Sequence, residues 1–188
     1  MTWRMPAETA PHERTWMAFP RPGLTLGDDP ASAEEAYAAW TAVAHAVAQF
    51  EPVTMVVDAV ERDRARRMLS AGIAQLEAPL DDYWMRDMGP TFVLDDERPG
   101  VLGGVDWIFN GWGAPKWATW ANDREIGRFV TEAAGAELVS SMLVNEGGAI
   151  HVDGEGTVLV TETVQLDPGR NPYADRPRVE AELARTIG

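Results

Sequence analysis

The spacing of apolar and polar positions predicts helices alternating with strands in the first part of the chain. Residues 31–50 place apolar side chains at helical intervals, and Ser32 followed by Glu35 is typical of a capping box at a helix start. Residues 52–58, PVTMVVD, form a β-branched apolar run that predicts a buried strand. A second helix is predicted over residues 59–72, ending near Gly72.

The same alternation continues to the end of the sequence, so the predicted class is mixed α/β. No stretch has the composition of a linker, and residues 1–188 are expected to form a single partial domain. The further predicted strands cover residues 73–78, 89–95, 100–110, 136–148 and a hairpin over 149–162 that turns at DGEG, and the further predicted helices cover 117–135 and 176–188.

A short pattern occurs twice in this sequence. Asp87 is followed by Gly89 and Val93, and Glu146 is followed by Gly148 and by a valine at the same offsets. In each copy the acid and glycine precede a strand, an acidic turn, a second strand and a helix. A repeated unit of this kind predicts an array of similar units, in which Asp87 and Glu146 face one common site.

Composition restricts the classes of function. The chain has 30 acidic and 16 basic residues, for a formal charge of −14, which argues against a nucleic-acid partner and is compatible with a cationic ligand. No stretch has the apolar length of a membrane span or the pattern of a signal peptide, so we expect no membrane partner and a cytoplasmic location. The chain has no Cys, which excludes disulfides, thiolate zinc sites and thiol nucleophiles within these residues.

Asp87 and Glu146 are the strongest candidates for a binding site. A guanidinium is planar and presents N–H donors in a fork, so two carboxylates could hold opposite edges of one such cation. The alternative is that each acid caps a separate turn. Trp84, three positions before Asp87, could stack on a cationic ligand or could fill the core.

Two other segments leave their roles open. His151 and Asp153 could join a metal site, form an acid–base pair, or be a strand histidine beside a turn aspartate. Trp112, Trp117 and Trp120 lie in a glycine-containing segment that could be a packed aromatic cluster or the rim of a pocket.

Five segments in order resemble the agmatine deiminase family, within the guanidine-modifying (pentein) superfamily that includes peptidyl-arginine deiminases. They are MPAETAPHERTWMAFP, DDYWMRDMGPTFV, FNGWGAPKWATWANDRE, NEGGAIHVDGEGTVLVTE and LDPGRNP. The resemblance implies a five-fold α/β propeller of ββαβ units, with about half of the blades in this chain. It also implies hydrolysis of agmatine to N-carbamoylputrescine and ammonia, a step of putrescine and polyamine biosynthesis.

By this resemblance Asp87 and Glu146 match the catalytic acids that bind the guanidinium, and Trp84 matches a tryptophan near the substrate. No metal and no cofactor are implied. A peptidyl-arginine or other guanidine substrate is an alternative, and so is a non-catalytic module that binds guanidines or polyamines.

The family's reaction also needs a Cys nucleophile and a His-x-Asp pair that lie later in its members, which are about twice as long. His151 and Asp153 match the His-x-Asp sequence pattern, but they belong to the Glu146 repeat, so we interpret them as structural or supporting residues. This chain alone is therefore expected to be inactive. Half of a closed propeller would expose strand edges, which allows a homo-oligomer.

Overall fold

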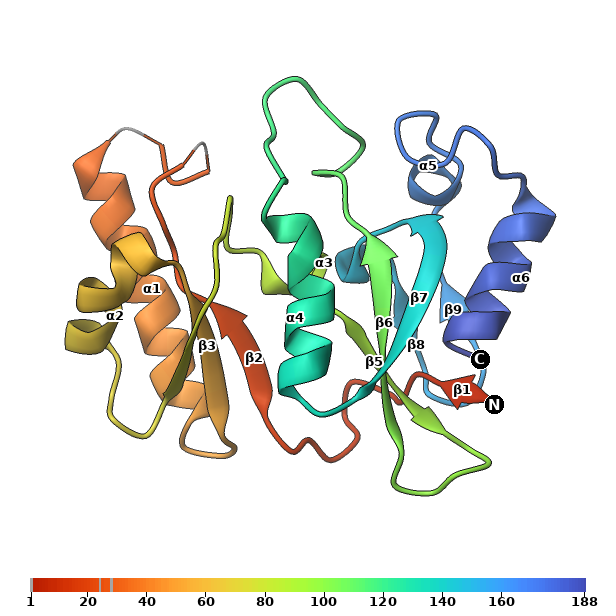
Figure 1. Cartoon of the computed structure of the whole chain (residues 1–188), viewed down its shortest axis with the longest axis horizontal. Helices are drawn as coiled ribbons and strands as arrows, with labels where there is room; N and C mark the ends of the chain where they lie inside the picture. Colours follow the sequence, from red (N-terminus) through yellow and green to blue (C-terminus); the bar gives the residue numbers. More distant parts are fainter. Residues whose placement is uncertain (1, 24, 28) are drawn as a thin grey trace. The chain divides into compact units, whose positions relative to one another are not determined.

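The computed structural model describes residues 2–23, 25–27 and 29–188 and has the predicted α/β class (Figure 1). The chain divides into two compact units. One unit combines the N-terminal segment up to Ala10 with Arg86–Gly188, and the other is Pro11–Met85. The single partial domain expected over residues 1–188 stays a prediction.

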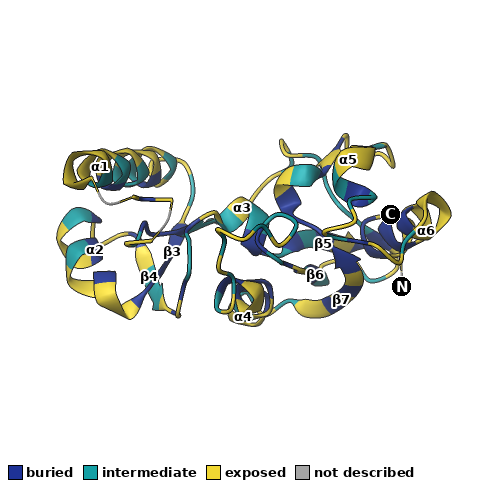
Figure 2. Ribbon diagram, turned by 90° about the horizontal axis from the view of Figure 1, so that it is seen from above, coloured by how far each residue is buried: buried dark blue, intermediate teal, exposed yellow. Residues whose placement is uncertain are grey.

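The Pro11–Met85 unit contains a parallel three-stranded sheet in the order β2-β3-β4. Its central strand is buried along its whole length, as the apolar run predicts (Figure 2). The second helix ends before the predicted Gly72, because Leu69 already has extended backbone angles. The elements in chain order are β2 (Thr15–Ala18), α1 (Pro30–Val47), β3 (Val53–Val57), η1 (Ala59–Glu61), α2 (Arg62–Met68) and β4 (Ala74–Glu77).

The start of α1 differs from the sequence prediction. The helix begins at Pro30, and Asp29 is its N-cap, with a carboxylate that accepts the backbone N–H groups of Ala31 at 3.3 Å and Ser32 at 3.1 Å. The Ser32 hydroxyl donates to the same carboxylate, so the capping box predicted at Ser32 and Glu35 is wrong. Proline suits the first turn because its missing N–H has no intrahelical partner there.

The larger unit holds a four-stranded sheet in the order β1-β5-β6-β7. β5 and β6 form an antiparallel hairpin, and β7 lies parallel to β6 after helix α4, which makes a complete ββαβ unit (Figure 1). β1 pairs antiparallel with β5 at the outer edge. The bounds are β1 (Trp3–Arg4), α3 (Met85–Met88), β5 (Thr91–Asp95), β6 (Leu102–Ile108), η2 (Asp123–Glu125), α4 (Ile126–Ala133) and β7 (Glu137–Val144).

The segment after β7 repeats the order of the segment after Asp87. Glu146 precedes an antiparallel hairpin of two short strands, and helices follow, which confirms the order of elements expected from the repeated pattern. The bounds are η3 (Gly147–Ala149), β8 (His151–Val152), β9 (Val158–Leu159), α5 (Glu162–Gln165) and α6 (Arg176–Thr186).

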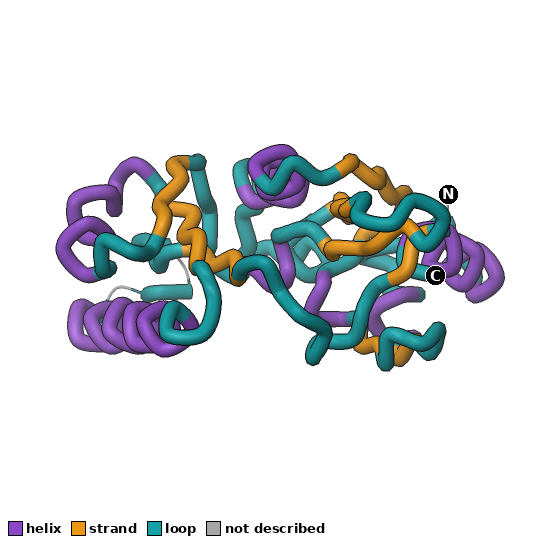
Figure 3. The backbone as a smooth tube through the Cα atoms, turned by 90° about the horizontal axis from the view of Figure 1, so that it is seen from below, coloured by secondary structure: helices purple, strands orange, loops and turns teal. Residues whose placement is uncertain are grey.

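The helix predicted over residues 117–135 begins later than expected. Helical structure starts only at η2, and the preceding residues form a long loop between β6 and α4 (Figure 3). The Trp117 ring stacks on the Trp112 ring at 6.0 Å, a contact within the loop that apolar spacing along a helix does not reveal. The apolar pattern also does not predict the strands β1 and β2 or the short helix α5.

The core of the larger unit lies between its sheet, the β8–β9 hairpin and α6. The N-terminal segment is part of this core, because Trp3 is buried in it and Met5 packs against it. The Met5 N–H also donates to the Ile187 carbonyl at 2.9 Å beside the end of α6. Among the residues that the structure describes, no helix combines the length and apolarity needed to cross a membrane. The buried core residues are Trp3, Val93, Val105, Trp107, Val139, Leu143, Ile150, Val152, Val179, Leu183 and Ile187.

Candidate functional site

Asp87 lies half-buried in the short helix α3, just before the Gly-Pro turn that leads into β5. Its Oδ2 accepts the indole N–H of Trp112 at 3.0 Å, and its Oδ1 accepts the backbone N–H of Gly148 at 3.2 Å. Both oxygens are therefore engaged by N–H donors from elsewhere in the fold. This arrangement differs from a solvated turn residue, and it fixes the orientation of the carboxylate.

The two glycines after Glu146 bring that segment against α3. A Cβ atom on Gly147 would lie 2.3 Å from the Arg86 carbonyl oxygen, and one on Gly148 would lie 2.3 Å from Asp87 Oδ1. The Arg86 oxygen belongs to the backbone, so the close approach at position 147 requires glycine, whereas a side chain at position 148 would displace the Asp87 carboxylate. The structure thus brings together the two acid-bearing segments that the repeat pattern pairs.

Glu146 follows β7 and is buried, with 6 % of its surface exposed. Its carboxylate binds the guanidinium of Arg170 in a bidentate way, with Nη2 donating to Oε1 at 2.6 Å and Nε donating to Oε2 at 3.1 Å. The third nitrogen, Nη1, donates to Asp167 at 2.5 Å. Sequence reasoning missed Arg170; the signal was its place in the LDPGRNP segment together with the need of a buried carboxylate for a cation.

The charges of this cluster stabilise one another. Burial acts to lower the pKa of the Arg170 guanidinium, but the hydrogen bonds and charges of Glu146 and Asp167 outweigh it and hold that pKa above its ordinary value. The pKa of Asp167 is lowered, first by the Gly169 N–H and then, against the effect of burial, by Arg170. Arg170 therefore stays a cation, and Asp167 stays an anion beside it.

A buried amide network fixes the segment that carries Arg170. Asn171 accepts the Val144 N–H at 2.9 Å and donates to the carbonyls of Val144 and Gln165, each at 3.0 Å. The Gln165 amide donates to the Asn145 side chain at 3.0 Å. These bonds tie residues 165–171 to the end of β7, directly before Glu146.

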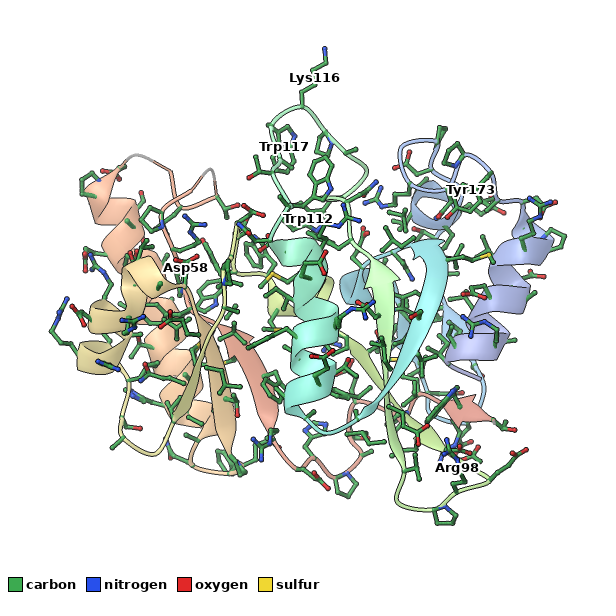
Figure 4. All side chains as sticks on the ribbon, in the orientation of Figure 1. Asp58, Arg98, Trp112, Lys116, Trp117 and Tyr173 are labelled. Atoms are coloured by element: carbon green, nitrogen blue, oxygen red, sulfur yellow. The ribbon has the colours of Figure 1, made fainter. Side chains whose placement is uncertain are left out.

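The loop between β6 and α4 contributes Trp112 to the site. Trp112 also packs edge-on against Phe109 and face-on against Trp117, whose side chain is 56 % exposed. Lys116 lies at the outer tip of the loop (Figure 4). These contacts confirm the aromatic-cluster interpretation for Trp112 and Trp117. A role of the loop as the rim of a pocket stays a prediction.

Trp84 belongs to the Pro11–Met85 unit and is 37 % exposed. Its ring stacks on Tyr83 at 5.4 Å and meets Trp40 edge-on at 5.5 Å. Trp84 thus packs against two aromatic rings but is exposed, so it does not fill the core, and its role near the substrate stays a prediction.

His151 and Asp153 lie on the β8–β9 hairpin. Asp153 accepts the N–H groups of Glu155 at 2.8 Å and Thr157 at 3.0 Å, so it shapes the turn. Hydrogen bonds from Thr157 and then Glu155 lower the pKa of this carboxyl group. His151 is exposed and lines an open cleft of about 680 Å³ together with Gly147 and Gly148. The turn bonds of Asp153 agree with its structural interpretation, whereas the interpretation of His151 stays a prediction.

A profile of the Porphyromonas-type peptidyl-arginine deiminase family matches residues 4–188 of this chain. The chain belongs to this family. An agmatine deiminase of Stutzerimonas stutzeri is 45 % identical over 95 % of the chain and 49 % of its own length. A Streptomyces coelicolor protein provisionally named agmatine deiminase is 57 % identical over the whole chain and 55 % of its own length.

The solved structure of the agmatine deiminase of Enterococcus faecalis has a TM-score of 0.91 and 35 % identity to this family member, over 99 % of the chain and 51 % of that structure. The fold is therefore the pentein-type α/β fold of these deiminases, with about half of their blades. The chain spans about half the length of the curated relatives it matches. The roles of Asp87, Glu146 and Trp84 toward a substrate stay predictions.

Proposed function

We propose that this chain is the N-terminal portion of an agmatine deiminase-type hydrolase and supplies its guanidinium-binding carboxylates. The carrying observation is that Glu146 already holds a guanidinium, that of Arg170, with both oxygens, in the segment that contacts Asp87. The names of the relatives support agmatine as the substrate. In the overall reaction, water adds to the guanidinium carbon and one C–N bond breaks, which gives N-carbamoylputrescine and ammonia.

The net negative charge of the site favours the binding of a second cation. Asp87, Glu146, Asp167 and Glu8 carry four formal negative charges against the two positive charges of Arg170 and of Arg86, which pairs with Glu8 and lies beside Asp87. Each carboxylate can accept about four hydrogen bonds, and Arg170 and the backbone use only part of that capacity. A substrate guanidinium would therefore bind against Asp87 and the remaining lone pairs of Glu146, as charge-assisted hydrogen bonds are the stronger class.

The nucleophile must come from outside these residues, because none of the 188 is Cys. We therefore assign this chain binding and orientation of the planar cation, and no turnover when it is alone. A place in putrescine formation and a cytoplasmic location belong to the same proposal, and association into a homo-oligomer stays a prediction.

Titration calorimetry on the purified chain tests this assignment. Agmatine should bind saturably, and putrescine, which lacks the guanidinium, should bind at least about tenfold more weakly, since its ammonium cannot make the bidentate contact. Asp87→Asn should weaken agmatine binding by a similar factor. Asp153→Asn is the matched control, because it neutralises a turn carboxylate whose acceptor role an amide oxygen can keep.

Equal affinity for agmatine and putrescine would refute guanidinium recognition. Ammonia release from agmatine by the chain alone would contradict the division of roles. The remaining half of a full-length relative could be supplied to this chain. Saturable agmatine binding without turnover in that mixture would favour a non-catalytic binding module.

A further inference from the structure

Four successive residues in the β6–α4 loop have positive φ angles. They are Gly111 at 66°, Trp112 at 66°, Gly113 at 98° and Ala114 at 53°. Glycine adopts such angles readily, whereas Trp and Ala do so at an energetic disadvantage. Left-handed residues normally occur singly, so a run of four is a local backbone strain that the surrounding structure must maintain.

Asn110 maintains this left-handed turn. Its backbone carbonyl accepts the Ala114 N–H at 2.9 Å, and its side-chain oxygen accepts the Gly113 N–H at 2.9 Å. Its amide nitrogen donates to the Gly169 carbonyl at 2.9 Å. One side chain thus closes the turn and attaches it to the segment that carries Arg170.

The turn contacts Asp87 directly and lies against Arg170, the cation that Glu146 binds. The Trp112 indole N–H donates to Asp87, as described above. On the other side, a Cβ atom on Gly113 would lie 2.8 Å from Asp167 Oδ2 and 3.0 Å from Arg170 Nη1. The turn therefore packs directly against the ion pair that orients Glu146.

We propose that the left-handed turn Gly111–Ala114 sets the relative placement of Asp87 and Glu146, with Trp112 and Arg170 as the positioning residues. Trp112 fixes the rotation of the Asp87 carboxylate, and Arg170, seated against Gly113, fixes that of Glu146. A carboxylate on a free side chain would rotate, whereas one donor on the strained turn and a second donor packed against that turn fix the orientation of both acids. That this placement of the two acids serves substrate binding rests on the proposed function. The coupling, meaning the dependence of both acids on the turn, does not rest on it.

The coupling is tested on the ¹⁵N-labelled chain by the indole N–H signal of Trp112 and the Nε–H signal of Arg170. Trp112→Phe assigns the first signal among the eight tryptophans, and Asp87→Asn shows where it moves when its charged acceptor is lost. Gly113→Ala should move both signals, because the added methyl group displaces the turn and the ion pair together. Gly156→Ala is the matched control, since its φ of 100° is nearly the same and nothing lies within 4 Å of its Cβ position.

If Gly113→Ala leaves either signal in place, or if Gly156→Ala moves both equally, the coupling does not exist. Should Gly113→Ala fail to fold, Asn110→Ala gives the same reading without added bulk, because it removes the side-chain bonds to Gly113 and Gly169. It should move both signals, and their constancy would overturn the coupling.

A binding measurement extends the test to the site. Trp112→Phe keeps an aromatic ring but removes the donor to Asp87, and it should weaken agmatine binding about tenfold. Trp117→Phe, which alters an exposed ring of the same stack, should leave the affinity unchanged. If the unaltered chain does not bind agmatine, the proposed function fails while the two signals still decide the coupling. If agmatine binds normally to Trp112→Phe, the positioning role of Trp112 is refuted.

Discussion

Replacing Arg170 by Met removes the cation that Glu146 holds and leaves a carboxylate in a buried place. The side chains of the pair are 10 % and 8 % exposed, so water cannot replace the lost partner without a rearrangement. The Met side chain keeps most of the apolar volume of the arginine stem, which limits the change to the charge and its hydrogen bonds.

Breaking a buried ion pair by removing one partner costs about 3–5 kcal/mol in free energy of unfolding. Because the pair keeps a small exposure to water, we expect a loss in free energy of unfolding at the lower end of this range, about 3 kcal/mol. With a urea dependence of about 2 kcal/mol per molar, this loss lowers the unfolding midpoint by about 1.5 M. The double change Glu146→Leu with Arg170→Met removes both charges and should recover a large part of the loss.

Urea unfolding followed by far-UV circular dichroism measures these differences, and the transition of the larger unit is the one that should move. Arg176→Met is the control, because it removes an arginine from the exposed pair with Glu180 and should leave the midpoint unchanged within error. If the midpoint of Arg170→Met equals that of the unaltered chain, the ion pair of Arg170 with Glu146 does not contribute to the stability of the fold. A double variant less stable than Arg170→Met alone would contradict the reasoning about the uncompensated charge.

Three further changes probe the same physical account. Hydrogen bonds from Arg185 lower the pKa of Glu182 from 4.5 to about 2, so its stabilising effect is complete above pH 4.5 and is lost as the pH falls toward 2. Glu182→Gln should therefore remove roughly 1–2 kcal/mol of stability at pH 7, after allowance for solvent screening, and flatten acid unfolding in that window. Gly147→Ala should destabilise the chain by about 1–3 kcal/mol in urea, because its Cβ would overlap a backbone carbonyl, whereas Gly72→Ala, with open space around its Cβ position, should not. Asp29→Ala should lower the thermal midpoint and Glu35→Ala should not, since only the first removes the cap of α1; equal effects would contradict the capping assignment.

The parts of the fold that could be predicted from sequence are those with strong local patterns. The run VTMVV predicts β3 within one residue of its observed bounds, and the pattern of residues 176–188 predicts the helix α6. The start of α1 was missed because Asp29 and Ser32 are both good caps. Proline at position 30 was the deciding local signal, since it favours the first turn.

The candidate site was predictable only in part. The repeated pattern pairs the segments of Asp87 and Glu146, and the structure brings these segments into contact through Gly148. Arg170 was missed because its bond to Glu146 spans 24 positions and depends on how residues 165–171 fold back onto β7. The contact of Trp112 with Asp87 depends on left-handed backbone angles at a non-glycine residue, which no apolar periodicity encodes.

The most direct test of the central claim is an activity measurement on a chimera. Residues 1–188 would replace the matching portion of the Stutzerimonas stutzeri agmatine deiminase, and release of ammonia and N-carbamoylputrescine from agmatine would be followed. The chimera should turn over agmatine, and the same chimera with Asp87→Ala should lose activity by at least a hundredfold while Asp153→Asn retains it. A folded chimera without activity, or one in which Asp87→Ala has no effect, would contradict the assignment of this chain as the guanidinium-binding portion of a deiminase.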